Sequence, residues 1–284
     1  MRTIIYFFIC LGIFLVSCKK VSTFRQISIK PQYALIETKD DIHTITDSTV
    51  VPYIYTKVIS LRNLEVDEKK QKFVEMLLPS ILVAQHSLSQ KISRIEHIEN
   101  WLQKNPSMLK TDSLFICQLF DTYNCKEIQE LKIRLKPHPV SIVLGQAALE
   151  SGWGSSRFLK DGNNIFGIWS YNSDENRIKA LVGRDSTSIY VKSYASIEDS
   201  VKDYFETIAR VDAYQKFRQE RFESDNPFIL IPLLNRYSEL GDTYTRKLKE
   251  IVESNNLTKY DFYVIGSEYF VEKEIKLSEM FLKE

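Results

Sequence analysis

Neither sign of charge is in excess in this 284-residue chain, where 38 Lys and Arg residues and 37 Asp and Glu residues leave a formal net charge of +1 at pH 7. Electrostatic capture of a polyanion needs a clear basic excess, so we expect no nucleic-acid partner. Histidine is scarce as well, at four residues. His43, His86, His97 and His138 show no metal-ligand spacing with one another or with the cysteines, so we predict neither a metal nor another cofactor.

Cysteine is equally scarce, and its placement matters more than its number. Cys10 and Cys18 lie close to the N-terminus, which leaves Cys117 and Cys125 in the body of the chain. An oxidising compartment would permit a disulfide between the latter two. Two free thiols are the alternative, because a sequence does not give the distance between the two Cα atoms.

The apolar run from Ile4 to Val16 is too short to span a bilayer comfortably and follows a charged start at Arg2, so it predicts an export signal. It ends in Leu-Val-Ser-Cys, which resembles a bacterial lipobox. That resemblance implies cleavage before Cys18 and lipidation of this cysteine, and a plain signal peptide is the alternative. We therefore expect an exported protein of the cell envelope, lipid-anchored to a bacterial membrane and facing the periplasm, with inner or outer membrane left open.

The rest of the chain divides by composition. Residues 18–51 are polar and irregular and predict a tether, and 52–136 predict a helical segment that packs on the catalytic part. Apolar residues recur at helical spacing from Val66 to Leu102 without a sustained heptad, which argues against a coiled coil, and Pro79 is expected to kink or divide this run. Residues 137–265 are the expected catalytic domain, and 266–284 are the expected tail.

The most informative segment joins an apolar helix to a sharp turn. Apolar side chains cover nearly every face from Val140 to Gly145, which suits a helix surrounded by protein. Glu150 ends this helix, so we expect a partly desolvated carboxyl with a raised pKa, as a general acid near neutral pH requires. Gly152 can stop the helix, and Trp153 offers a flat face of the kind that stacks on sugar rings. The alternative is an ordinary C-terminal glutamate beside a core tryptophan.

A second segment, residues 158–169, places amides and glycines among aromatic side chains. Asn164 is expected to face a glycan, because a buried amide needs a polar partner. Donors and acceptors for hydroxyl and acetamido groups beside stacking surfaces are typical of a carbohydrate site.

Together the two segments resemble the glucosaminidase family of bacterial peptidoglycan hydrolases, glycoside hydrolase family 73, whose members carry an A-x-E-S-G-W-G run followed by N-N-[IL]-F-G. Residues 194–204 and 237–244 are similar to the Bax-type branch of that family. The resemblance spans roughly residues 52–261 and is strongest from 137 onward. It implies a mainly α (α+β), lysozyme-like fold, in which a helical lobe and a small β-hairpin lobe flank a glycan-binding cleft, with Glu150 as the catalytic acid.

The β-hairpin lobe is predicted at residues 177–182 and 188–194, which alternate on either side of a turn at 183–186. Hydrolysis normally needs a second carboxylate, which the resemblance places in this lobe. Asp174, Glu175 and Asp185 are the candidates, and Glu175, at the entry to the first strand, is favoured. Whether the enzyme retains or inverts stays open, because a sequence does not give the gap between the carboxyl groups.

Aromatic and amide side chains complete the expected site. Tyr237 is predicted to lie near the scissile bond, and the residues expected to bind the glycan are Gln146, Trp153, Asn164, Phe166 and Tyr244. Tyr204 and Tyr214 are assigned mainly to packing, and His138 to a surface or capping role in the Pro137-His138-Pro139 turn.

The predicted function is a monomeric hydrolase that cuts the β-1,4 bond after N-acetylglucosamine in peptidoglycan strands. A lytic transglycosylase on the same scaffold needs only one acid and is the second hypothesis. A glycan-binding lipoprotein without catalysis is the third.

Overall fold

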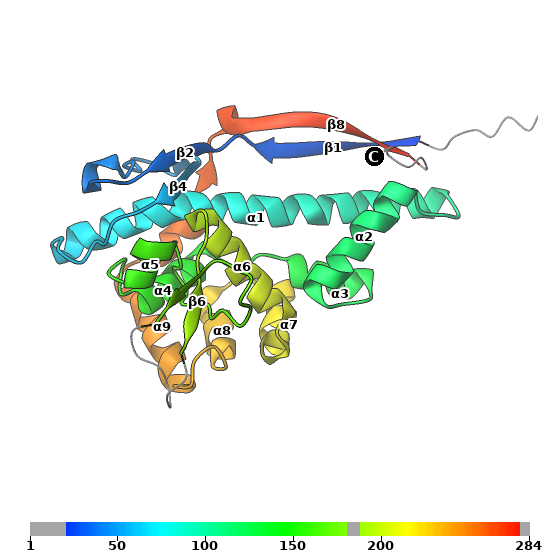
Figure 1. Ribbon diagram of the computed structural model, residues 1–284. Helices are drawn as coiled ribbons and strands as arrows, with labels where there is room; N and C mark the ends of the chain where they lie inside the picture. The colour runs from blue at the N-terminus through cyan, green and yellow to red at the C-terminus, as the bar shows by residue number, and fades with distance from the viewer. Residues whose placement is uncertain (1–20, 181–187, 279–284) are drawn as a thin grey trace, which may run out of the picture.

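The computed structural model describes residues 21–180 and 188–278. Its longest element is α1 (Val66–Lys104), a helix of 39 residues that runs along the whole body (Figure 1). Every residue of α1 from Phe73 to Ala84 is buried. Pro79 lies inside this buried stretch and does not divide the helix. The packing that surrounds Pro79 offsets the loss of one backbone hydrogen bond.

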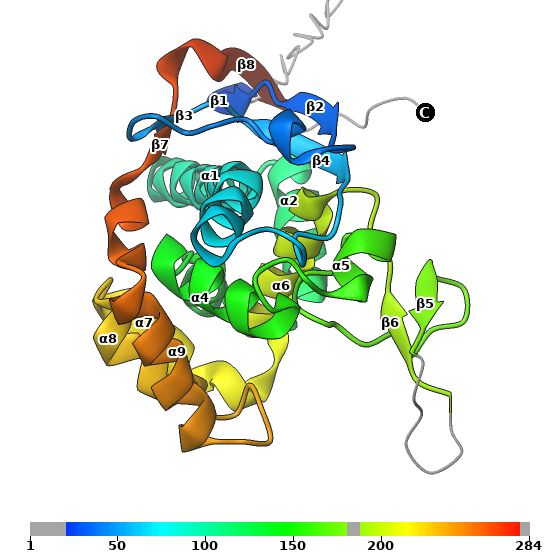
Figure 2. The same ribbon diagram turned by 90° about the vertical axis from the view of Figure 1, so that its left-hand side faces the viewer.

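The predicted catalytic part packs on one side of α1, as Figure 2 shows. At its centre is α4 (Val140–Ser151), which contacts α1, and beside it lie α6 (Ile197–Arg210) and α9 (Asp242–Ser254). Gly145 allows α4 and α9 to approach closely, because a Cβ there would lie 2.8 Å from Leu248 Cδ1 and 2.9 Å from Val252 Cγ2.

The start of α4 is fixed by a carboxylate from a distant part of the chain. The Ser141 backbone N–H donates to Asp261 Oδ1 at 2.7 Å and its hydroxyl donates to Asp261 Oδ2 at 2.8 Å. Pro139 occupies the N-cap position, where no side chain caps the helix. Asp261 therefore supplies the cap and sets the position of the helix that carries Glu150.

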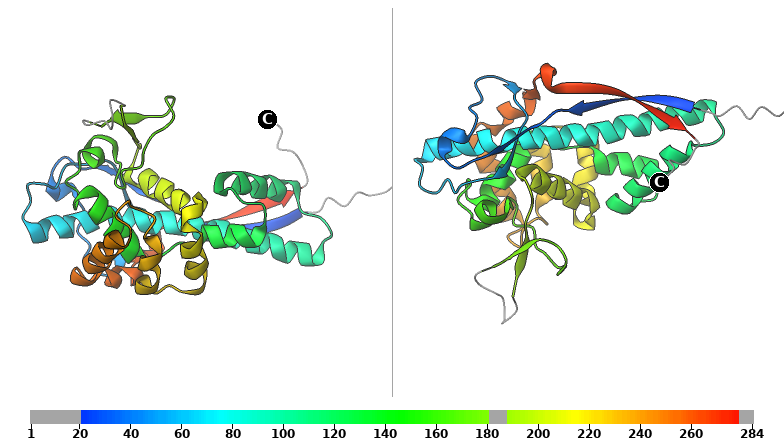
Figure 3. Two further views of the ribbon diagram at one scale, coloured as in Figure 1. Left: turned by 90° about the horizontal axis from the view of Figure 1, so that it is seen from below. Right: turned by 45° about the horizontal axis from the view of Figure 1, so that its top comes forward.

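A small antiparallel hairpin, β5 (Arg177–Lys179) with β6 (Tyr190–Lys192), projects from this helical body (Figures 2 and 3). Both strands fall inside the predicted segments, and the predicted turn at 183–186 lies outside the described residues. The expectation of a mainly helical fold with a small β-hairpin lobe is confirmed.

The expected tether and tail are instead the two strands of one ribbon. β1 (Val21–Ile29) pairs antiparallel with β8 (Phe270–Ser278) over the full length of both, and the ribbon lies along α1 (Figure 1). The prediction of an irregular tether is wrong for residues 21–29, and residues 270–278 of the expected tail form a strand. The pairing joins segments about as far apart in sequence as the chain allows, so neither strand alone shows its partner.

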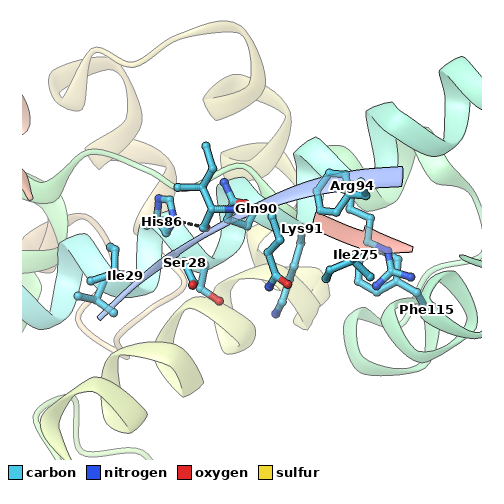
Figure 4. Close-up of a pocket in the computed structure, with 13 residues that line it drawn as sticks. Ser28, Ile29, His86, Gln90, Lys91, Arg94, Phe115 and Ile275 are labelled. Carbon is cyan, nitrogen blue, oxygen red and sulfur yellow. Dashed lines mark hydrogen bonds between the residues drawn. The ribbon is translucent and has the colours of Figure 1, made fainter. Parts of the chain in front are cut away.

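Side chains of α1 attach the ribbon and leave a hollow beneath it. Gln90 Oε1 accepts from Ile27 N at 2.9 Å, and His86 Nε2 lies 2.8 Å from Ile27 O. The hollow, of about 380 Å³, lies between the ribbon, α1 and Phe115 (Figure 4). Because His86 and Gln90 are already bound to the ribbon and Arg94 is paired with Asp112, these polar groups serve the structure.

The remaining elements join these parts. The helices are α2 (Lys110–Tyr123), α3 (Ile128–Leu135), α5 (Arg157–Gly162), α7 (Gln215–Glu223) and α8 (Pro227–Leu230), with short 3-10 turns η1 (Lys39–Asp41), η2 (Asp212–Tyr214), η3 (Ile231–Leu234), η4 (Leu257–Phe262) and η5 (Ser267–Tyr269). Two short parallel pairs, β2 (Gln32–Leu35) with β4 (Tyr53–Lys57) and β3 (Thr49–Val50) with β7 (Val264–Ile265), fold residues 32–57 onto the body.

Cys117 and Cys125 do not form a disulfide. Cys117 is exposed and Cys125 is buried, and both are free. Burial raises the pKa of the Cys125 thiol to about 11, so it stays protonated and unreactive at neutral pH.

Candidate active site

Glu150 lies in the last turn of α4, which Gly152 closes in the left-handed conformation at φ 58°. The Glu150 side chain is accessible to solvent, as a group that meets a substrate must be. Desolvation by the surrounding protein nevertheless raises the pKa of its carboxyl, and the Tyr244 hydroxyl partly opposes that rise. The raised pKa expected for Glu150 is therefore found at this helix end, and its role as the acid stays a prediction.

A wall of tyrosines faces Glu150. Tyr237 and Tyr244 stack with ring centroids 5.5 Å apart, and Tyr204 and Tyr214 each contact Tyr237 at 6.4 and 6.2 Å. Burial raises the pKa of each, to about 12 for Tyr214, and the negative charge of Glu150 adds to every one of these rises. All four hydroxyls thus stay protonated, so they can donate hydrogen bonds but do not act as bases.

Gln146 lies one helical turn before Glu150 and is completely buried. Its amide Nε2 donates to Tyr244 Oη at 3.0 Å, and its Oε1 accepts from Tyr204 Oη at 2.6 Å. Both ends of the amide are occupied, so the expectation that Gln146 binds the glycan directly is corrected. Its place is behind the acid, between two tyrosines.

Asn164 is also turned inward. Its Nδ2 donates to Ile168 O at 3.0 Å and Lys192 O at 2.8 Å, and its Oδ1 accepts from Ile168 N at 3.1 Å. These bonds fasten the 164–168 turn to β6, which corrects the expectation of a glycan contact. The buried amide did need a polar partner, and that partner is the chain's own backbone.

Two aromatic side chains expected at the glycan also pack against protein. Phe166 is buried and stacks on Tyr204 with centroids 4.1 Å apart. Trp153, at φ 56°, is half-buried and meets Phe73 of α1 edge-on at 5.6 Å, with Lys70 Nζ 5.5 Å from its ring. Phe166 thus supports the tyrosine wall, while Trp153 keeps part of its surface available.

The two described candidates for the second carboxylate, Glu175 and Asp174, make their polar contacts with groups other than Glu150. Glu175 Oε2 lies 4.0 Å from Lys192 Nζ, and Lys192 also pairs with Asp203 of α6 at 2.8 Å. Asp174 is exposed in the loop before β5, and Asp185 lies outside the described residues. Within the described chain, neither Glu175 nor Asp174 bonds to Glu150 or to the tyrosine wall.

Sequence reasoning missed two polar residues behind the site. His138 is buried, at 1% exposure, with Nε2 2.7 Å from Tyr204 Oη, so the predicted surface or capping role is wrong. Tyr204 packs as expected but also carries the hydrogen bonds that join His138 to Gln146. The available signal was Gln146 itself, because an amide inside an apolar helix requires buried partners.

Other kinds of site are not evident in the part of the chain that the structure covers. Within residues 21–180 and 188–278, no group of His, Cys, Asp and Glu side chains could hold a metal ion. In the same ranges, no helix combines the length and apolar character that crossing a membrane takes.

Comparison with known proteins shows what the region around Glu150 is similar to. Residues 125–257 match the Glucosaminidase family model, described as mannosyl-glycoprotein endo-beta-N-acetylglucosaminidase. Protein bax of Escherichia coli K12 is 29% identical over 127 residues, which are 41% of this chain and 43% of that protein. The chain thus matches less than half the length of this curated relative.

Solved structures show a weaker similarity. The catalytic domain of the autolysin Auto from Listeria monocytogenes has 25% identity and a TM-score of 0.37, over 58% of this chain and 96% of that one. A peptidoglycan hydrolase from Sphingomonas sp. A1 has 24% identity and a TM-score of 0.36, over 50% and 91%. Both TM-scores lie below 0.5, so these structures carry no argument about this chain.

Proposed function

We propose that residues 125–257, which match the Glucosaminidase family model, form a glycoside hydrolase domain of that family, and that the chain cleaves the β-1,4 bond that follows N-acetylglucosamine in peptidoglycan. The observation that carries the proposal is Glu150, an accessible carboxyl with a raised pKa at the end of a buried helix, facing hydroxyl donors. The choice of peptidoglycan rests on the two motifs around Glu150 and Asn164.

In the proposed mechanism, Glu150 arrives protonated and gives its proton to the glycosidic oxygen as the bond to the anomeric carbon breaks. The departing sugar takes that proton, and water adds to the oxocarbenium-like carbon while the second carboxylate accepts the proton that the water loses. The Tyr244 hydroxyl stabilises the carboxylate that Glu150 becomes, because a donated hydrogen bond favours the charged form. Tyr237, stacked on Tyr244, is proposed to orient the sugar or the water through its hydroxyl.

Glu175 is the proposed second carboxylate. It lies just before β5 and beside Lys192, on the lobe that would cover a glycan bound at Glu150. Glu175→Gln should lower kcat with little change in KM. Full activity of Glu175→Gln would transfer this role to Asp174 or Asp185.

The decisive experiment digests purified peptidoglycan with a soluble form starting at residue 21 and identifies the new chain ends by mass spectrometry. Hydrolysis yields reducing N-acetylglucosamine ends, and Glu150→Gln should yield none. The matched control is Glu253→Gln, an exposed glutamate of α9 whose loss should not alter the products. Anhydro-muramic ends would identify a lytic transglycosylase instead. Binding without turnover, unchanged in Glu150→Gln, would leave only the glycan-binding hypothesis.

We also propose that Cys18 is lipidated and holds the protein in the bacterial cell envelope, on the strength of the Leu-Val-Ser-Cys sequence. Mass spectrometry of the full-length protein from membranes should find a diacylated N-terminal peptide starting at Cys18. Cys18→Ala should move the protein to the soluble fraction. An unmodified Cys18 peptide would refute the anchor and leave a plain signal peptide.

A further inference from the structure

We propose that His138 and Arg221 are positioning residues, which fix the direction of a buried hydrogen-bond chain so that Tyr244 points its hydroxyl proton at Glu150. The chain runs from Arg221 through His138, Tyr204, Gln146 and Tyr244. This inference rests on the proposed role of Glu150 as the acid.

The links of the chain are short and buried. Arg221 Nη1 lies 3.4 Å from His138 Nδ1, and His138 Nε2 lies 2.7 Å from Tyr204 Oη. The Tyr204 hydroxyl reaches Gln146 Oε1 at 2.6 Å, and Gln146 Nε2 reaches Tyr244 Oη at 3.0 Å. The Tyr244 hydroxyl lies close enough to Glu150 to lower the pKa of its carboxyl. The chain thus connects α7, the turn before α4, α6, α4 and α9.

A chain of this kind can in principle run in either of two directions. In the forward direction, Gln146 donates to Tyr244, which leaves the Tyr244 proton free for Glu150. Rotating the Gln146 amide by half a turn reverses every link, so that Tyr244 must donate to Gln146 and Glu150 loses its donor. In the reversed chain Tyr204 would donate to His138 Nε2, which would place the imidazole proton on Nδ1.

Arg221 decides between the two directions. A guanidinium only donates, so His138 Nδ1 must offer it a lone pair, and the imidazole proton must be on Nε2. His138 then donates to Tyr204, Tyr204 donates to Gln146, and Gln146 donates to Tyr244. In the reversed chain two donors would meet at 3.4 Å.

Arg221 is held rigidly enough to impose this choice. It is buried at 1% exposure, and its Nη2 donates to Ile133 O at 2.8 Å and Arg134 O at 3.1 Å. These carbonyls lie at the C-terminal end of α3, whose partial negative charge favours a cation. Arg221 forms no ion pair with a carboxylate of the described residues, and its charge adds to the effect of burial in lowering the pKa of His138.

His138 also has to stay neutral, since an imidazolium would place a second donor against Arg221. Burial and the charge of Arg221 lower the pKa of His138 well below its ordinary value. The other groups around the ring are neutral, namely Tyr204 and Phe205 of α6 and Phe217 of α7. His138 is therefore neutral at neutral pH.

The consequence appears at Glu150, whose titratable neighbours are Tyr204, Tyr214, Tyr237 and Tyr244. All are neutral, so Tyr244 is the neighbour that stabilises the carboxylate left after proton donation. If the hydrogen-bond chain loses its direction, the Tyr244 hydroxyl no longer donates to Glu150. The pKa of Glu150 then rises, and Glu150 becomes a weaker acid.

The test compares two substitutions at one position. His138→Phe keeps an aromatic ring among Tyr204, Phe205 and Phe217 but removes both nitrogens. His138→Gln can donate to Tyr204 through its Nε2 and accept from Arg221 through its Oε1, so it reproduces the required pattern without titrating. We expect kcat to fall about tenfold in His138→Phe, with KM within twofold, and to recover in His138→Gln.

The pKa of Glu150 supplies a readout that does not depend on hydrolysis. In ¹³C-labelled protein its side-chain carboxyl resonance is the one that disappears in Glu150→Gln. We expect its titration midpoint to rise by about one pH unit in His138→Phe, the order of one charge-assisted hydrogen bond, and to return in His138→Gln. Tyr204→Phe keeps its ring stacked on Phe166 and should give the same rise, so it serves if His138→Phe does not fold.

Tyr123→Phe is the matched control. It also removes a buried hydroxyl, one bound by Lys91 at 2.9 Å on α2, away from the chain. It should leave the midpoint and kcat unchanged. An unshifted midpoint in folded His138→Phe or Tyr204→Phe, or an equal loss in the Phe and Gln variants of His138, would overturn the proposal. Absence of hydrolysis by the unmodified protein would refute the proposed function and leave this titration still decisive for the chain.

Discussion

Replacing Tyr244 by Phe isolates the hydroxyl that joins the buried chain to the acid. The ring is 4% exposed and stacks on Tyr237 at 5.5 Å, so Phe conserves both its volume and its stacking. The Gln146 amide, itself 0% exposed, then loses its acceptor. A buried donor left unsatisfied costs about 1–3 kcal/mol, which should lower the Tm by several degrees.

The effect on catalysis is separate and larger. A hydrogen bond to a charged group contributes about 1.5–3 kcal/mol, so losing the one that stabilises the Glu150 carboxylate should lower kcat about ten- to a hundredfold. The pKa of Glu150 should rise further. Because the acid works protonated, the basic limb of the kcat profile should move to higher pH while its plateau falls.

The assay follows release of reducing ends from peptidoglycan across pH, beside thermal unfolding of the same samples. Tyr123→Phe again controls for the loss of a buried hydroxyl remote from Glu150. If Tyr244→Phe is folded at the assay temperature and retains the kcat and pH profile of the unmodified protein, the reasoning is wrong. A loss of stability alone would mean that Tyr244 serves only packing.

Further predictions concern stability. The folded-state pKa of Glu150 is raised, so this carboxyl contributes most to stability below its unfolded pKa, and the contribution is lost as pH rises through the folded pKa. Glu150→Gln should therefore have a higher Tm than the unmodified protein at pH 7. The difference in Tm should disappear below about pH 4. Gly145→Ala should destabilise by about 1–3 kcal/mol through overpacking on α9, and Leu248→Val, which lacks the clashing methyl, should relieve part of that cost in thermal melts. Leu277→Ala, at 1% exposure in the ribbon, should cost about 2–3 kcal/mol in denaturant melts and leave kcat unchanged; an unaltered melt would mean that the ribbon does not dock.

The parts of the fold that the sequence predicts are those specified by local patterns. The apolar run before Glu150 predicts α4, and the alternation around residues 177–194 predicts the hairpin, since each is readable within one short window. The β1–β8 ribbon is not predicted from any short window of sequence. Each strand is irregular in composition, and its hydrogen-bond partner lies at the other end of the polypeptide. Pro79 misleads for a related reason, since the packing around α1 outweighs a local preference.

At the site, the sequence identifies which residues are polar and buried but not what satisfies them. Asn164 and Gln146 each need a polar partner, and a sugar hydroxyl and a backbone carbonyl are equally good acceptors on chemical grounds. The structure gives both amides partners within the protein. The two prolines that flank His138 mark a turn and suggest a surface position, whereas in the structure the imidazole lies against Tyr204 of α6.

The arrangement explains why an acid at this position needs a polar interior behind it. Desolvation alone would keep Glu150 protonated but would also resist release of the proton, since the carboxylate formed has no charged neighbour among the described residues. A donor that is already oriented reduces that resistance without a change of conformation during the reaction. Tyr244 can be such a donor only if the Gln146 amide is fixed in one orientation, and the fixed guanidinium of Arg221 sets that orientation through His138 and Tyr204. On the proposed mechanism, the direction of the hydrogen-bond chain, more than the presence of any one hydroxyl, therefore adapts Glu150 to both hold and give up its proton.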